Sequence, residues 1–244
     1  MTRRRWIADE VFGRHAALTG THADHLIRVL RARVGQQFDI AAGPGLYRGR
    51  ISAIADHRVE FELVEQLPAS SPPQVTLLLA IIKFDRMEWA LEKCTELGVS
   101  RFIPLIAARS DSHLSSAASK RVERWKRIAR EASEQSRRRC PPEIRDPIRP
   151  KDAVLLPAAK RILLSESGEG GTLGQALLAD EAASELILAV GPEGGWTETE
   201  DKLFRESGWI PASLGQTILR TETAAIAATA IALSQLQVLA GNKS

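Results

Sequence analysis

Hydrophobic and polar positions follow different patterns before and after about residue 70. Residues 38–40, 47–51 and 58–64 alternate apolar and polar side chains, which is typical of strands with one buried face. Turn residues separate these strands at 43–45 and 56–57. A helix is predicted before them, over residues 22–31, with Leu26, Val29 and Leu30 on one face. The first part of the chain therefore predicts a small β-barrel or β-sandwich.

After residue 74, strands and helices alternate. The continuous apolar runs, typical of strands buried on both faces of a parallel sheet, are residues 75–82, 102–106, 161–164 and 186–190. Helices are predicted at about residues 87–97, 117–136 and 172–179. A T-x-x-E capping box at 197–200 predicts the start of another helix. This alternation predicts an α/β fold with a mostly parallel sheet.

One segment, residues 67–73, lacks charge and is rich in proline and serine, as expected of a linker. We therefore predict domains at residues 1–70 and 74–244. The uncharged stretch 223–242 is long enough to span a bilayer. Its threonine, serine, glutamine and many alanine residues instead predict a buried helix of a soluble protein, without membrane attachment.

Charge is polarised along the 244 residues, although the net charge is only +3. Residues 120–151 hold twelve basic and five acidic side chains, and such a cluster attracts polyanions such as RNA unless it is only a solvated helix face. Cys94 and Cys140 are too few for a disulfide framework, so two free thiols are expected. No apolar run follows the basic start, which favours a cytoplasmic location. The five histidines form no metal-ligand pattern, and no metal is predicted.

The first motif is GPEGG at residues 191–195, between the apolar strand 186–190 and the capping box. Glycines in such a turn let the backbone approach a ligand, and ligands of open α/β sheets bind beyond the carboxyl ends of strands. An ordinary tight turn would have the same composition. Neither G-x-G-x-x-G nor the Walker pattern is present, which argues against dinucleotide and ATP chemistry.

The second motif, LGQTILRTETA at residues 214–224, runs into the uncharged C-terminal stretch. Arg220 and Glu222 flank Thr221, a good N-cap, and a carboxylate in the first turn of a helix is favoured by the helix dipole. Capping plus a salt bridge is the structural alternative to a functional role. The small residues beyond suit close helix packing or a dimer contact.

Together, LAVGPEGGWT at 188–197 and SLGQTILRTETAA at 213–225 strongly resemble the RsmE family of 16S rRNA uridine-N3 methyltransferases in the SPOUT superfamily. The resemblance extends over almost the whole chain. Its further segments are residues 25–31, 83–89, 93–99, 134–137 and 142–144.

This resemblance implies an N-terminal PUA-like β-barrel that binds RNA and a C-terminal SPOUT α/β domain with a deep trefoil knot. It also implies S-adenosyl-L-methionine as cofactor, 16S rRNA in the small ribosomal subunit as partner, and a homodimer. The implied cofactor-binding residues are Leu164, Ser165, Glu166, Gly191, Pro192, Glu193, Gly194, Gly195, Leu214, Gly215, Ile218, Leu219, Arg220, Thr221, Thr223 and Ala224.

For catalysis, Arg220 is the first candidate, because a guanidinium near the uracil carbonyls would stabilise negative charge on the ring. Glu222 or Glu193 could accept the N3 proton, or could only orient the loops. Trp6 and Trp196 are candidates for stacking on bases, or for simple packing. The candidate phosphate contacts are Arg3, Arg4, Arg5, Arg28, Arg31, Arg33, Arg137, Arg138 and Arg139.

The leading hypothesis is an S-adenosylmethionine-dependent methyltransferase that acts on N3 of a specific uridine in 16S rRNA. One alternative is a SPOUT methyltransferase acting on another RNA, such as tRNA. The other is a non-catalytic RNA-binding protein of ribosome assembly.

Overall fold

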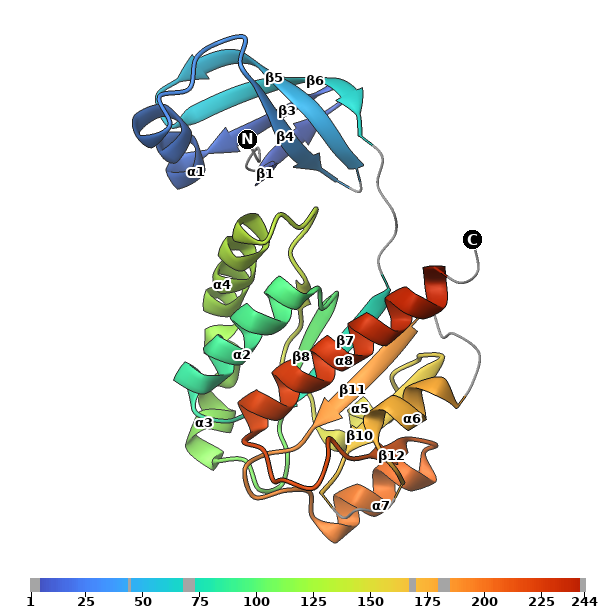
Figure 1. Cartoon of the computed structure of the whole chain (residues 1–244). Coiled ribbons are helices and arrows are strands. Elements are labelled where there is room, and N and C mark those ends of the chain that lie inside the picture. The colour runs from blue at the N-terminus through green and yellow to red at the C-terminus, as the bar shows by residue number, and fades with distance from the viewer. Residues whose placement is uncertain (1–4, 44, 68–72, 167–169, 180–184, 242–244) are drawn as a thin grey trace. The chain divides into compact units, whose positions relative to one another are not determined.

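The computed structural model describes residues 5–43, 45–67, 73–166, 170–179 and 185–241 (Figure 1). The chain divides into two compact units. Unit 1 comprises Met1–Ser71 and Arg130–Pro141, and unit 2 comprises Pro72–Ala129 and Pro142–Ser244. The basic segment 130–141 therefore groups with the N-terminal part, although it lies far along the sequence from it.

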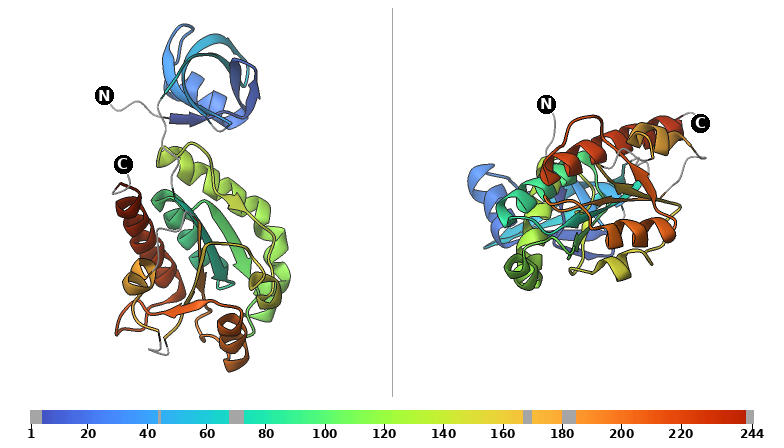
Figure 2. Two further views of the ribbon diagram at one scale, coloured as in Figure 1. Left: turned by 90° about the vertical axis from the view of Figure 1, so that its right-hand side faces the viewer. Right: turned by 90° about the horizontal axis from the view of Figure 1, so that it is seen from below.

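Unit 1 is built on one mixed sheet with the strand order β1-β4-β5-β6-β3-β2, which curls strongly (Figure 2). Its strands are β1 (Arg5–Ile7), β2 (Glu10–Phe12), β3 (His15–Thr19), β4 (Gln37–Ala42), β5 (Gly45–Ala55) and β6 (Arg58–Gln66). Among the strands in the described part of this unit, β1 and β4 pair in parallel and the other neighbours pair antiparallel. The predicted strands are confirmed as β4, β5 and β6. The first three strands were not predicted, because three to five residues are too few to reveal an alternation.

The helix predicted at residues 22–31 is shorter and differently wound. It consists of α1 (Gly20–Asp24) and a π-helical turn, η1 (His25–Val29), in which the amide of Leu30 donates to the carbonyl of His25 at 3.1 Å. The wider turn rotates the following side chains away from the positions that a 3.6-residue period assigns. Leu26 is buried as predicted, but Val29 is 65% exposed and Leu30 is exposed too, so that part of the prediction is wrong.

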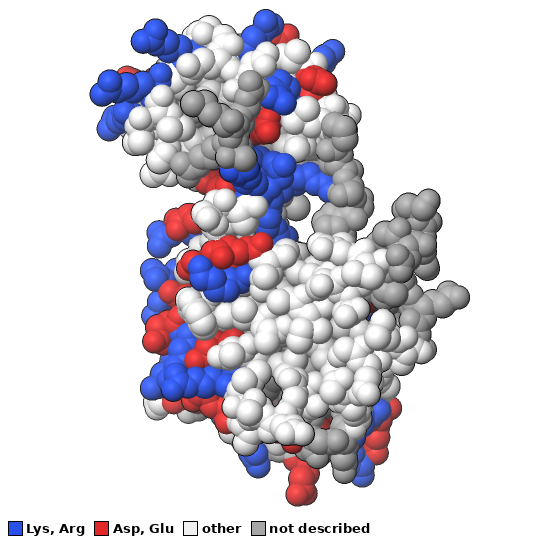
Figure 3. All heavy atoms as spheres, viewed as in Figure 1, with Lys and Arg blue, Asp and Glu red and all other residues white. Residues whose placement is uncertain are grey.

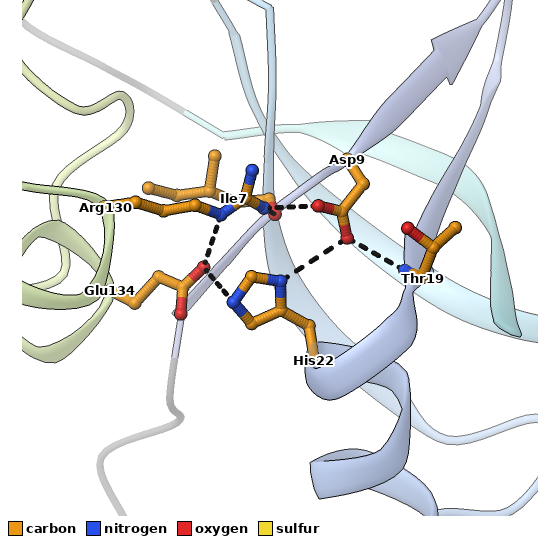
Figure 4. A network of polar contacts seen from close by, with 6 residues as sticks. All are labelled: Ile7, Asp9, Thr19, His22, Arg130 and Glu134. Atoms are coloured by element: carbon orange, nitrogen blue, oxygen red, sulfur yellow. Dashed lines mark hydrogen bonds and ion pairs between the residues drawn. The ribbon is translucent and has the colours of Figure 1, made fainter. Parts of the chain in front are cut away.

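A polar network anchors residues 130–141 within unit 1 (Figure 4). Arg130, on α4 (Val122–Gln135), contacts Oδ1 of Asp9 at 2.8 Å and donates to the carbonyl of Ile7 at 2.9 Å. Its Nε lies 3.3 Å from Oε1 of Glu134. His22 lies between the two carboxylates, 3.5 Å from Asp9 and 3.3 Å from Glu134. Charge pairing between distant segments thus explains a grouping that hydrophobic periodicity does not predict.

Unit 2 contains a parallel sheet with the strand order β12-β10-β11-β7-β8-β9. Its strands are β7 (Gln74–Ala80), β8 (Arg101–Leu105), β9 (Glu143–Ile144), β10 (Lys160–Leu164), β11 (Glu185–Val190) and β12 (Ile210–Ala212). Along β11, Leu186 and Leu188 enter one hydrophobic core, whereas Ile187 and Ala189 enter another. Both faces of the sheet are therefore buried, which confirms the α/β prediction.

Helices cover both faces of this sheet (Figures 1 and 2). The core on one face includes residues of α2 (Phe84–Leu97), α4, α6 (Leu173–Leu178) and α8 (Thr221–Gly241), and the core on the other includes residues of α5 (Pro150–Ala153) and α7 (Glu198–Glu206). The helix predicted at 117–136 is interrupted: α3 (Ser112–Ala117) and a 3₁₀ turn, η2 (Ala118–Arg121), precede α4. Cys94 is buried, Cys140 is exposed, and both are free thiols, as predicted. None of the helices in the described residues is long and apolar enough to cross a bilayer.

Candidate functional site

A cavity of about 450 Å³ lies at the carboxyl ends of β10, β11 and β12 in unit 2. Its walls come mainly from the three segments that follow these strands, around residues 164–166, 190–198 and 212–224. Small-molecule sites typically have volumes of about 300–1,000 Å³, and parallel sheets bind ligands at this edge. The sheet and the cavity define unit 2 as a small-molecule-binding α/β domain.

Most of the predicted cofactor-binding residues line this one cavity. They are Leu164, Ser165, Glu166, Gly191, Pro192, Glu193, Gly194, Gly195, Leu214, Gly215, Ile218, Leu219, Thr221 and Ala224. Arg220, Glu222 and Thr223 do not line it. Arg220 is exposed, and Glu222 is only 5% exposed, in the first turn of α8.

Further lining residues were not among those named individually as cofactor-binding, although Gln216 and Thr217 lie within the second motif, residues 214–224. They include Arg109, Val190, Trp196, Thr197, Glu198, Asp201, Ala212, Ser213, Gln216 and Thr217. Most lie within or beside the two motifs at residues 188–197 and 213–225. Arg109 does not: it follows β8, and only the adjacency of parallel strand ends could have identified it.

The lining combines apolar side chains with an excess of negative charge. Ile218, which is 80% exposed, lies with Leu164, Leu214 and Leu219 on the apolar part. Among the residues that the structure describes, the charged ones in the lining are the carboxylates of Glu166, Glu193, Glu198 and Asp201 and the guanidinium of Arg109. This composition suits a ligand with an apolar ring system and a positive charge. No cluster of three or more potential metal ligands occurs among the described residues.

The glycine loop, residues 191–196, is shaped by close contacts. Gly195 has φ +71°, and its amide donates to the carbonyl of Pro192 at 2.8 Å, which closes a turn that a side chain would strain. A Cβ at Gly191 would lie 3.0 Å from the indole of Trp196. That indole donates from Nε1 to the carbonyl of Leu164 at 2.8 Å, which links the loop to the end of β10. The predicted capping box of Thr197 with Glu200 is confirmed.

Two predicted catalytic carboxylates share one cation that was not predicted. Arg86, in the first turn of α2, donates from Nη1 to Glu193, and its Nε lies 3.8 Å from Oε1 of Glu222. The other oxygen of Glu222, Oε2, is buried and has no hydrogen-bond partner. A buried carboxylate oxygen without a donor is uncommon in native structures, so this oxygen is available to accept a hydrogen bond.

The predicted RNA-binding arginines of unit 1 differ in their surroundings. Arg3 and Arg4 lie outside the described residues, whereas Arg28, Arg31, Arg33 and Arg137 are exposed. Arg5 is half-buried and donates to the carbonyl of Arg137, and Arg138 and Arg139 are half-buried. Burial lowers the pKa of Arg5 and of Arg138, so these cations are only partly solvated.

The two tryptophans proposed for base stacking are both packed. Trp6 is 1% exposed within the unit 1 core, so the proposal that it stacks on RNA bases is wrong. Trp196 is half-buried, with its indole nitrogen bonded to Leu164.

Comparisons with known proteins agree with this architecture. The family model of the RNA methyltransferase domain matches residues 69–233. Two relatives are named ribosomal RNA small subunit methyltransferase E. The protein from Synechocystis is 32% identical to this chain, and the match covers 95% of this chain and 75% of the relative. The protein from Bacillus subtilis is 30% identical, and the match covers 93% of both chains. A crystal structure of ribosomal RNA small subunit methyltransferase E from Neisseria gonorrhoeae bound to S-adenosyl methionine matches with a TM-score of 0.81 and 30% identity, covering 98% of each chain. The chain therefore belongs to the RsmE family of RNA methyltransferases.

Proposed function

We propose that this protein uses S-adenosylmethionine to methylate N3 of a specific uridine in 16S rRNA of the small ribosomal subunit, and that it acts in the cytoplasm. The observation that carries the proposal is the cavity formed by three strand-end segments, in a chain whose relatives are named ribosomal RNA small subunit methyltransferase E. The similar protein from Neisseria gonorrhoeae has been solved with S-adenosyl methionine bound.

The cavity residues fit this cofactor. The apolar side chains of Leu164, Leu214 and Ile218 can enclose an adenine ring, and the acidic lining complements a cationic sulfonium. Bound there, S-adenosylmethionine supplies an electrophilic methyl group. The chain has to exclude water, align the target base and remove its N3 proton.

For the proton, we propose a carboxylate of the Arg86 cluster. Glu193 lies on the cavity wall, and Glu222 has an oxygen without a partner. We assign to Arg220 the role of stabilising negative charge on the uracil carbonyls; its exposure leaves the guanidinium available to an incoming nucleotide.

We also propose a fold type for each of the two units. We infer that unit 1 is a PUA-like RNA-binding barrel, supported by its curled sheet and its exposed arginines. We infer that the segments after β10, β11 and β12 form the trefoil knot of SPOUT domains, supported by their convergence on one cavity.

A homodimer is proposed on the uncharged face of unit 2, where Figure 3 shows uncharged side chains over α8. Exposed apolar side chains occur on α8 and on α2, which packs against it: Ile231, Val238, Trp89 and Leu97. A face of this kind is typical of an interface.

Methyl transfer from labelled S-adenosylmethionine tests the function, with small-subunit particles, naked 16S rRNA and bulk tRNA as separate substrates. We expect label in small-subunit RNA and one new reverse-transcription stop at a uridine, since N3 methylation blocks base pairing. Arg220→Ala should abolish the stop. Label in tRNA alone would support a different RNA target. Cofactor binding without label in any RNA would support a role in ribosome assembly.

A further inference from the structure

The glycine loop, residues 191–196, forms one wall of the cavity, but much of what holds it comes from other strand ends. Glu193 and Gly194 are exposed. Within the loop, the backbone hydrogen bond from the amide of Gly195 to the carbonyl of Pro192 closes the turn. An exposed turn of this kind needs support from its neighbours to keep one shape in the absence of ligand.

Arg86 supports the loop through a side chain. It follows β7, which is the neighbour of β11 in the sheet, and its Nη1 donates to the carboxylate of Glu193. Its Nε faces Glu222 at 3.8 Å. One guanidinium therefore joins the loop to the first turn of α8. A planar fork with two donors can do this, whereas the single ammonium of lysine cannot reproduce its geometry.

Arg109 supports the loop through its backbone. It follows β8, and its Nη1 donates to the carbonyl of Gly194 at 2.6 Å and to that of Trp196 at 3.3 Å. Its methylene groups pass so close to Gly194 that a Cβ there would lie 3.3 Å from Cδ of Arg109. The backbone next to Arg109 is fixed as well, because the amide of the preceding residue, Ala108, donates to Oε1 of Glu200 at 2.7 Å.

We propose that Arg86 and Arg109 are positioning residues for the cofactor site, which clamp the glycine loop in the shape that forms the cavity wall. The clamp gives each arginine a function that neither motif predicts. It rests on the proposed function only in identifying the cavity as the site of the methyl donor.

The test compares Arg86→Gln, Arg86→Lys and Arg109→Gln with the wild type. The matched control is Arg101→Gln, because Arg101 pairs with Glu143 at 2.6 Å at the amino end of β8 and does not line the cavity. Two quantities are measured on the full-length chain. The first is hydrogen exchange of the loop peptide 191–196 without ligand, and the second is the Kd for S-adenosylhomocysteine, an unreactive analogue, by calorimetry.

Each clamp variant should accelerate exchange of the loop and weaken binding by about tenfold, as expected for the loss of a charge-assisted hydrogen bond. Exchange in peptides from β7 should not change, which distinguishes loop opening from unfolding. Arg86→Lys should behave like Arg86→Gln, and Arg101→Gln like the wild type. Normal loop exchange in Arg86→Gln and Arg109→Gln would refute the clamp.

A double-variant cycle tests whether Arg86 acts through Glu193. If it does, Arg86→Gln, Glu193→Gln and the double variant should have similar loop exchange and similar Kd. Additive effects would show that the two residues act independently and would refute this part of the proposal.

Arg109 could instead bind the carboxylate of the ligand. In that case Arg109→Gln would leave loop exchange unchanged and would weaken S-adenosylhomocysteine but not its decarboxylated form, which would overturn the assignment. A wild-type chain that binds neither S-adenosylmethionine nor S-adenosylhomocysteine would refute the proposed function, and the exchange data would still decide on the clamp.

Discussion

Substitution of Arg130 by methionine should destabilise unit 1 specifically. The side chain makes contacts of 2.8 Å to Asp9, 2.9 Å to the carbonyl of Ile7 and 3.3 Å to Glu134 (Figure 4). Hydrogen bonds involving charged groups contribute about 1.5–3 kcal/mol each when buried. Arg130 is 27% exposed, so water replaces part of this interaction, and we expect a loss of about 2–3 kcal/mol.

The loss should depend on pH, because it arises from two carboxylates left without their cation. Burial raises the pKa of Glu134, so this group stabilises the fold below its unfolded-state pKa and loses that effect as pH rises through the folded-state value. The contribution of Asp9 to stability depends on pH in the opposite direction. Although burial alone would raise the pKa of Asp9, hydrogen bonds from His22 and the amide of Thr19 hold it below its usual value. Its contribution is present above the unfolded-state pKa and is lost as pH falls through the folded-state value.

The difference between Arg130→Met and the wild type should therefore be largest where both carboxylates are ionised, and it should shrink as pH falls and Glu134, whose pKa is raised by burial, takes up a proton. Urea unfolding followed by pulsed hydrogen exchange measures it, since peptides from β1 to β3 report on unit 1 and peptides from β7 and β11 report on unit 2. Arg50→Met is the control, because its partner Glu62 is exposed. An equal loss in both units, or a loss independent of pH, would refute the reasoning.

Three other substitutions or modifications follow from the structure. Lys160→Met should lower stability by about 2 kcal/mol in thermal unfolding, because the buried ammonium donates to two carbonyls near the end of α6 at 3.0 and 3.2 Å. Gly195→Ala, at φ +71°, should lower the free energy of unfolding by about 1–2 kcal/mol and raise the Kd for S-adenosylhomocysteine. The control is Gly174→Ala in α6, which has open space around it and should not raise this Kd. Burial raises the pKa of Cys94 to about 12, whereas Cys140 is exposed. A thiol reagent at about pH 8 should therefore modify Cys140 alone in the folded chain, and both cysteines after unfolding. Rapid modification of Cys94 in the folded chain would contradict this prediction.

Sequence patterns predicted the central strands of unit 2 because burial on both faces leaves a continuous apolar run, as in β7, β8, β10 and β11. The outer strands β9 and β12 have two and three residues, too few to show any pattern. The η1 turn was missed for another reason: its residues have the right composition for a helix, but an extra residue in the turn breaks the period on which the prediction relied.

The two motifs identified the part of the cavity wall that is local in sequence. The clamp could not be predicted in the same way, because the adjacency of β11, β7 and β8 is a property of the sheet order. One local signal did exist. Arg86 is a cation in the first turn of α2, where the helix dipole disfavours positive charge. Glu193 and Glu222 compensate this charge, so a cation at the start of a helix is a local signal of acidic partners elsewhere in the fold.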